Sequence, residues 1–122
     1  MADVVDRQAF EQLADELGSP ESARRIVGLY VDLLEQRVER LARACEADDL
    51  ETAMDAVLSL KVTSATVGAV TMRDRALDVE SRLRQGGCAD AVSALTAVRC
   101  ARGATAEGIS RLCTTSLHAG SR

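Results

Sequence analysis

The chain has 122 residues, of which 47% are hydrophobic and only 2% aromatic, and its formal net charge is −4. This length fits one domain, and an acidic chain without clustered lysine and arginine argues against a nucleic-acid partner. No apolar run of about 18 residues is present to cross a membrane, and residues 1–7 lack the apolar region of a secretory signal. We therefore expect a cytoplasmic protein that binds neither nucleic acid nor a membrane.

Helical periodicity runs through almost the whole chain and predicts five helices. Between the first two, Gly18-Ser19-Pro20 combines a glycine that can end a helix, a capping serine and a proline suited to a first turn. Asp48-Asp49-Leu50-Glu51 has the form of a capping box that begins the third helix, Gly68 can close that helix, and Gly86-Gly87 stops the fourth. The predicted ranges are about 6–17, 20–47, 48–68, 70–85 and 89–117.

Each predicted helix carries one apolar stripe at spacings of three and four, which we expect to face a common core. The inward positions are Phe10, Leu13 and Leu17; Val27, Tyr30, Leu34, Val38, Leu41 and Cys45; Val57, Leu60, Ser64 and Val67; Met72, Ala76, Val79 and Leu83; and Ala91, Leu95, Val98, Ile109 and Leu112. Gly103 and Gly108 interrupt the last stripe, and each costs about 1 kcal/mol relative to alanine. We therefore expect a bend or a frayed stretch near residues 102–108.

Short connections between helices favour antiparallel neighbours. The predicted fold is all-α: an antiparallel four-helix bundle with an additional N-terminal helix. Residues 1–113 form a single domain in this prediction, and residues 114–122 form a flexible C-terminal tail.

No metal site or cofactor site is expected. The cysteines Cys45, Cys88, Cys100 and Cys113 are widely spaced and have no histidine nearby, unlike the ligands of a zinc site. The only histidine, His118, lies in the predicted tail, where nothing would position it as a ligand, a catalyst or a displaced phosphoacceptor.

The predicted third helix contains Leu58-Ser59-Leu60-Lys61-Val62, followed by Gly68. This segment resembles the signature of histidine-containing phosphotransfer (HPt) domains, H-x-L-K-G with a further glycine six residues later. Leu60, Lys61 and Gly68 match the signature, Leu58 stands at the phospho-accepting histidine, and Val62 stands at the first glycine. The similarity extends over about Val4 to Leu112 and includes Leu17-Gly18-Ser19-Pro20, Tyr30, the turn at Ala47–Leu50, the Gly68-Ala69 junction and Glu80.

The resemblance implies a place in bacterial two-component signalling but not the family's chemistry. In the family, the histidine accepts a phosphoryl group through a nucleophilic ring nitrogen, and leucine has no lone pair to offer. The resemblance also places Lys61 one turn away, where it would supply positive charge, and places Val62 where the family leaves space for a receiver. We therefore expect a degenerate member that is not an enzyme.

The function that this resemblance implies is binding without chemistry. The candidate docking residues are Leu58, Val62 and Ala65, which form a second apolar stripe on the predicted third helix, and Lys61 beside them. Exposed apolar patches often mark partner surfaces. The expected partners are a response-regulator receiver domain, a histidine kinase, or both. The same stripe would also fit a helix that is buried on a wide face. Lys61 could then be an ordinary lysine exposed to solvent.

The sequence is also compatible with two other functions. The chain could be a helical adaptor or a homodimer in which the second stripe mediates self-association, with no link to phosphorelay. It could also be an active phosphotransfer protein that uses another residue, although Ser59, Thr63 and Ser64 offer hydroxyls without a general base on their face. The stretch with Arg73, Arg75, Arg82 and Arg84 alternates with acids that include Glu80, and it reads as a solvated, self-paired face.

Overall fold

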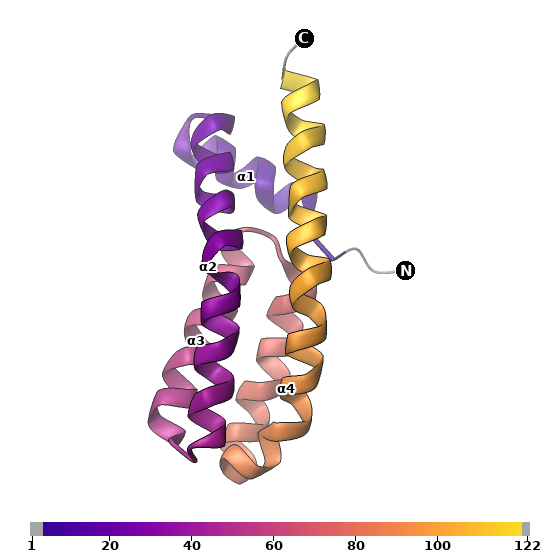
Figure 1. The fold of residues 1–122 in the computed structure, drawn as a ribbon. Helices are drawn as coiled ribbons and strands as arrows, with labels where there is room; N and C mark the ends of the chain where they lie inside the picture. The colour runs from indigo at the N-terminus through magenta and orange to yellow at the C-terminus, as the bar shows by residue number, and fades with distance from the viewer. Residues whose placement is uncertain (1–3, 121–122) are drawn as a thin grey trace.

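The computed structural model describes the backbone of residues 4–120 and the side chains of residues 4–112. It contains the helices α1 (Arg7–Leu17), α2 (Pro20–Glu46), α3 (Leu50–Thr66) and α4 (Val70–Gly120) (Figure 1). Within α4, Gly87 has a non-helical backbone (φ 74°, ψ −163°), so two helices meet there. We call residues 70–86 the first arm of α4 and residues 88–120 its second arm.

The bundle is formed by α2, α3 and the two arms of α4, which run alternately up and down (Figure 1). Helix α1 lies across one end of the bundle, against α2 and α3. This arrangement confirms the predicted all-α four-helix bundle with an additional N-terminal helix.

The helix ends between α1 and α2 follow the predicted chemistry. Gly18 adopts a left-handed conformation (φ 74°) after α1, and the Ser19 side chain accepts a hydrogen bond from the backbone N–H of Ser22 at 3.3 Å. At α3 the predicted cap is wrong by one residue, because Asp49 and not Asp48 accepts from the N–H of Thr52, at 3.1 Å. Asp48 instead occupies a left-handed turn position with φ 55°.

The predicted core stripes are buried with one exception. Leu17 is 43% exposed because it is the last residue of α1, where the chain turns away at Gly18. The expected bend near residues 102–108 is also wrong, since the second arm of α4 is helical through both glycines. A Cβ at Gly108 would lie 3.1 Å from the Val5 side chain, so this glycine permits close packing of the N-terminal segment.

Gly68 joins the turn between α3 and α4 to the start of α1. Its carbonyl accepts a hydrogen bond from the backbone N–H of Asp6 at 2.7 Å. Its φ is 78°, and a Cβ there would lie 2.7 Å from the Asp6 carbonyl oxygen. Glycine is therefore required by both the backbone conformation and the space, and this contact fixes α1 at the end of the bundle next to α3.

The C-terminal end of the chain is described only as backbone. Helix α4 continues to Gly120, and the domain boundary after residue 113 stays a prediction. The side chains of Cys113 and His118 lie outside the described residues. Among the helices that the structure describes, none is both long enough and apolar enough to span a membrane.

Candidate functional site

Helix α3 presents one face to the core, and that face is held to α2 by a buried hydrogen bond. Val57, Leu60 and Ser64 are fully buried. The Ser64 hydroxyl lies 2.7 Å from the hydroxyl of Tyr30 on α2. Burial raises the pKa of Tyr30 to about 12, and the hydrogen bond with Ser64 offsets part of that rise. Because the core face is fixed in this way, the remaining side chains of α3 are held at a defined orientation.

The candidate docking residues lie at different depths on α3. Val62 is 59% exposed and Ala65 is also exposed. Leu58 is partly buried and packs against the core cluster, so it forms the border between the core and the surface. Lys61 is partly buried as well. The structure therefore brings Leu58, Val62 and Ala65 to one side of α3, with only the last two fully at the surface.

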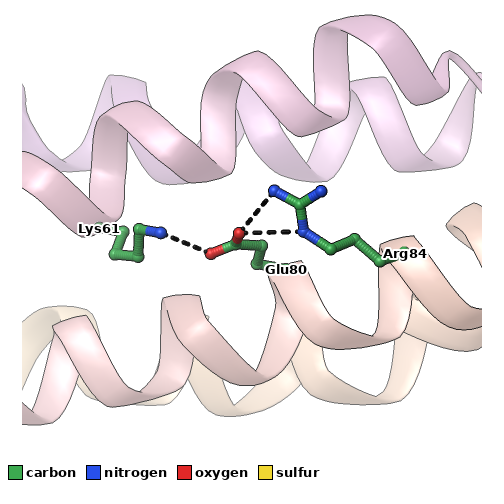
Figure 2. A network of polar contacts seen from close by, with 3 residues as sticks. All are labelled: Lys61, Glu80 and Arg84. Carbon is green, nitrogen blue, oxygen red and sulfur yellow. Dashed lines mark hydrogen bonds and ion pairs between the residues drawn. The ribbon is translucent and has the colours of Figure 1, made fainter.

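Lys61 is engaged in an ion-pair network that joins α3 to the first arm of α4 (Figure 2). Its Nζ donates to Oε1 of Glu80 at 2.8 Å, and the Arg84 guanidinium donates to Oε2 of Glu80 at 2.8 and 3.1 Å. Lys61 first and then Arg84 lower the pKa of Glu80 below its ordinary value, while burial opposes them. The expectation of a freely solvated lysine is wrong, because the ammonium group has a partner within the chain.

The prediction that the charged residues of the first arm of α4 form a solvated, self-paired face is only partly correct. Arg73 pairs with Asp74 at 3.0 Å and Arg82 with Asp78 at 3.2 Å, as expected. Glu80 differs, since its side chain is only 12% exposed and binds a residue of another helix. The sequence does not reveal this role of Glu80, because it depends on the packing of α3 against α4. Arg84, with 59% of its side chain exposed, is the network's accessible cation.

The hydroxyl groups near Leu58 are mostly engaged in hydrogen bonds. Thr63 donates to the backbone carbonyl of Ser59 at 2.8 Å, Thr66 donates to that of Val62 at 2.9 Å, and Ser64 is buried against Tyr30. Ser59 is exposed.

A carboxylate near Ser59 corrects the expectation that no base shares the face of these hydroxyls. Asp55 lies four residues before Ser59, so the two side chains are neighbours on the helix surface. The Asp55 carboxylate is occupied by Arg40 of α2, at 2.7 Å. This pair, like the Glu80 network, depends on helix packing that the sequence does not reveal.

Small hollows continue the candidate surface on both sides of α3. One hollow of about 140 Å³ lies between α2 and α3, and another of about 210 Å³ lies between α1 and α3. The first is lined by Ile26, Leu29, Tyr30, Arg37, Thr63, Thr66 and Val67, and the second by Ala9, Gln12, Leu13, Glu16, Ala65 and Thr66. A partner that covers Val62 and Ala65 can therefore also reach α1 and α2.

Comparisons with known proteins place this geometry in a family. The family model described as Hpt domain matches residues 25–115, which is most of the chain and includes all of α3. The chain belongs to the Hpt domain family. Membership connects this Hpt domain with phosphotransfer signalling, in which receiver domains and kinases are the general partners.

A solved structure shows the same fold. It is the crystal structure of a rice protein described as a histidine-containing phosphotransfer protein, with a TM-score of 0.76 and 20% sequence identity. The superposition covers 91% of this chain and 80% of the rice chain. The comparison with curated proteins gives no match. Both the family match and the fold therefore confirm the resemblance expected from the Leu58–Gly68 segment.

Proposed function

We propose that this Hpt domain is a non-phosphorylatable module that binds a response-regulator receiver or a histidine kinase without transferring phosphate. The observation that carries the proposal is Leu58, an aliphatic side chain at the position where the motif has its histidine. Phosphoryl acceptance needs a nucleophile with a lone pair, and leucine has none. The hydroxyls of Thr63, Ser64 and Thr66 are already hydrogen bonded. Ser59 is exposed, but the Asp55 carboxylate on its side of the helix is paired with Arg40.

Docking is supported by the chemistry of the α3 surface around this position. Val62 and Ala65 expose apolar groups on α3, and Ala65 also lines the hollow between α1 and α3. Such patches are typical of partner surfaces. Since Lys61 is paired with Glu80, we assign to Lys61 the positioning of α3 against α4. The exposed Arg84 is then the better candidate for contact with an acidic partner pocket.

Val62 also determines how a partner can approach. A branched side chain that is 59% exposed stands where the motif has a glycine. A receiver that docks here contacts an apolar surface at Leu58 and Val62 and cannot bring its active site as close to α3 as a glycine would permit. Binding of this kind would occupy or scaffold the partner, and it would not relay phosphate.

Two measurements on the same set of receiver and kinase domains test the proposal. Incubation with phosphorylated receivers should leave the wild-type chain unlabelled, whereas isothermal titration calorimetry should detect a complex with at least one domain. Val62→Asp should abolish this complex without unfolding the chain, because Val62 is exposed and contributes little to the core. Val92→Asp is the matched control, because Val92 is 52% exposed on the second arm of α4, outside the proposed surface.

Each failure has a distinct meaning. Stable labelling of the wild-type chain would refute the non-phosphorylatable assignment and favour transfer through another residue, which mass spectrometry would locate. Absence of binding to every receiver and kinase would refute docking and favour the adaptor alternative. A gain-of-function variant tests the steric reasoning, since Leu58→His should accept label better when combined with Val62→Gly than alone.

A further inference from the structure

The outward side of α2 carries a face that the bundle does not use. Its residues recur at helical spacing directly opposite the buried stripe of Val27, Leu34 and Leu41. We call it the outer α2 face, and it consists of Glu21, Arg25, Gly28, Leu29, Asp32 and Gln36, all of them exposed. Leu29 at its centre is 56% exposed. In the part of the chain that the structure describes, the side chains of Arg25 and Asp32 form no hydrogen bond or ion pair.

Gly28 has no explanation within the bundle. Glycine is among the least favourable residues in a helix interior, and Gly28 lies in the middle of the first half of α2. A Cβ at Gly28 would have no atom within 4 Å, so neither close packing nor a left-handed conformation requires glycine there. Glycine on an exposed helix face does permit the backbone of another molecule to approach closely.

We propose that two copies of this chain associate through the outer α2 face, with their α2 helices antiparallel and crossing at Gly28 and Leu29. In such a two-fold arrangement each contact occurs twice. Leu29 of one copy packs over Gly28 of the other, which provides the space for it. With this register, Arg25 of each copy lies opposite Asp32 of the other.

The charges favour a second copy over an unrelated partner. Arg25 lies three residues before Gly28, and Asp32 lies three residues after Leu29, so opposite charges are placed symmetrically about the crossing point. An isologous interface needs this self-complementary pattern, whereas an unrelated partner does not. The outer α2 face lies on α2 and does not include Val62, although its Leu29 also lines the hollow between α2 and α3. The inference does not depend on the proposed function.

Analytical ultracentrifugation of the full chain tests the proposal with a charge-swap series. The wild type should show a monomer–dimer equilibrium. Arg25→Asp and Asp32→Arg should each raise the dimer dissociation constant about tenfold or more, because like charges then face each other twice. The double variant, Arg25→Asp with Asp32→Arg, should restore dimerisation, since both opposite-charge pairs are rebuilt.

Gly28→Leu separates association from folding. Leucine favours a helix more than glycine does, so the thermal stability of the folded monomer should not fall, while the dimer should be lost. Val62→Asp serves as the control that leaves the dimer intact.

Several results would overturn the proposal. A wild-type chain that stays monomeric up to millimolar concentration would refute it, as would a double variant that does not recover dimerisation. If the Arg25 and Asp32 variants weaken receiver or kinase binding but leave self-association unchanged, the outer α2 face binds a different partner and the homodimer is wrong.

Discussion

The buried hydrogen bond between Tyr30 and Ser64 lies directly behind the proposed docking surface, and its removal should destabilise the bundle. The two hydroxyl oxygens are 2.7 Å apart, and both residues are almost completely buried. Tyr30→Phe leaves the Ser64 hydroxyl without its partner, and Ser64→Ala does the same to Tyr30. A buried hydroxyl without a partner costs about 1–3 kcal/mol, so each variant should lose that amount from the free energy of unfolding.

The double variant separates the hydrogen bond from other effects of the substitutions. When both partners become apolar, no unsatisfied hydroxyl remains, and the change can be nearly neutral. Tyr30→Phe with Ser64→Ala should therefore lose less than the sum of the single variants, by about 1 kcal/mol or more. Urea unfolding followed by far-UV circular dichroism measures all four proteins. Strictly additive losses would show that the two hydroxyls are not coupled and would refute the reasoning.

Tyr30 also gives this hydrogen bond a spectroscopic signature. It is the only tyrosine of a chain without tryptophan, so the ultraviolet absorbance of phenolate reports on it alone. Folding raises the pKa of Tyr30 from 10.0 to about 12. Tyr30 therefore ionises first in the unfolded state as the pH rises. The contribution of neutral Tyr30 to the free energy of unfolding is therefore complete below pH 10 and is lost between pH 10 and about 12. Tyr30→Phe should lack this loss, and a titration midpoint near 10 in the folded protein would contradict the buried placement.

Three further predictions concern single positions. Glu80→Gln should lower the free energy of unfolding at neutral pH. The difference in this free energy between the variant and the wild type should disappear as the pH falls through the lowered pKa of Glu80, which urea unfolding across the acid range would measure. A difference that persists in acid would argue against the ion pair. Gly68→Ala should lower the free energy of unfolding by about 1–3 kcal/mol, because alanine there has a left-handed backbone and clashes with Asp6. Hydrogen exchange should show faster opening of α1 in this variant than in the control Gly103→Ala, where a Cβ meets no atom within 4 Å. Thr105→Val should raise the free energy of unfolding by about 1 kcal/mol, because the buried Thr105 hydroxyl has no hydrogen-bond partner among the described residues. A lower melting temperature would show that the hydroxyl has a stabilising contact.

The core could be predicted from the sequence because helical periodicity determines which residues share a face. The stripe of Val57, Leu60, Ser64 and Val67 is completely or almost completely buried, as expected. Even the polar Ser64 fits, since spacing alone placed it on the core side. Periodicity fails at Leu17, because the last residue of a helix has no following turn to keep it against the core.

Contacts between helices could not be predicted from local pattern. Glu80 stands in a stretch that alternates arginine and acid, which is typical of a solvated face. Only the packing of α3 against α4 brings Lys61, 19 residues earlier, to within 2.8 Å of it. Gly108 is ambiguous for the same reason. A glycine in a helical pattern indicates either a break in the helix or the close approach of another segment. The packing of Val5 against Gly108 shows that a close approach explains this glycine.

The positions of the Hpt motif also differ between core and surface. Its three retained positions carry the fold: Leu60 is buried in the core, Lys61 joins α3 to α4 through Glu80, and Gly68 provides the left-handed turn that binds the start of α1. The two altered positions, Leu58 and Val62, lie at the edge of the core and on the surface. Because substitutions at the surface usually cost little stability, Leu58 and Val62 at these two positions are compatible with a preserved bundle.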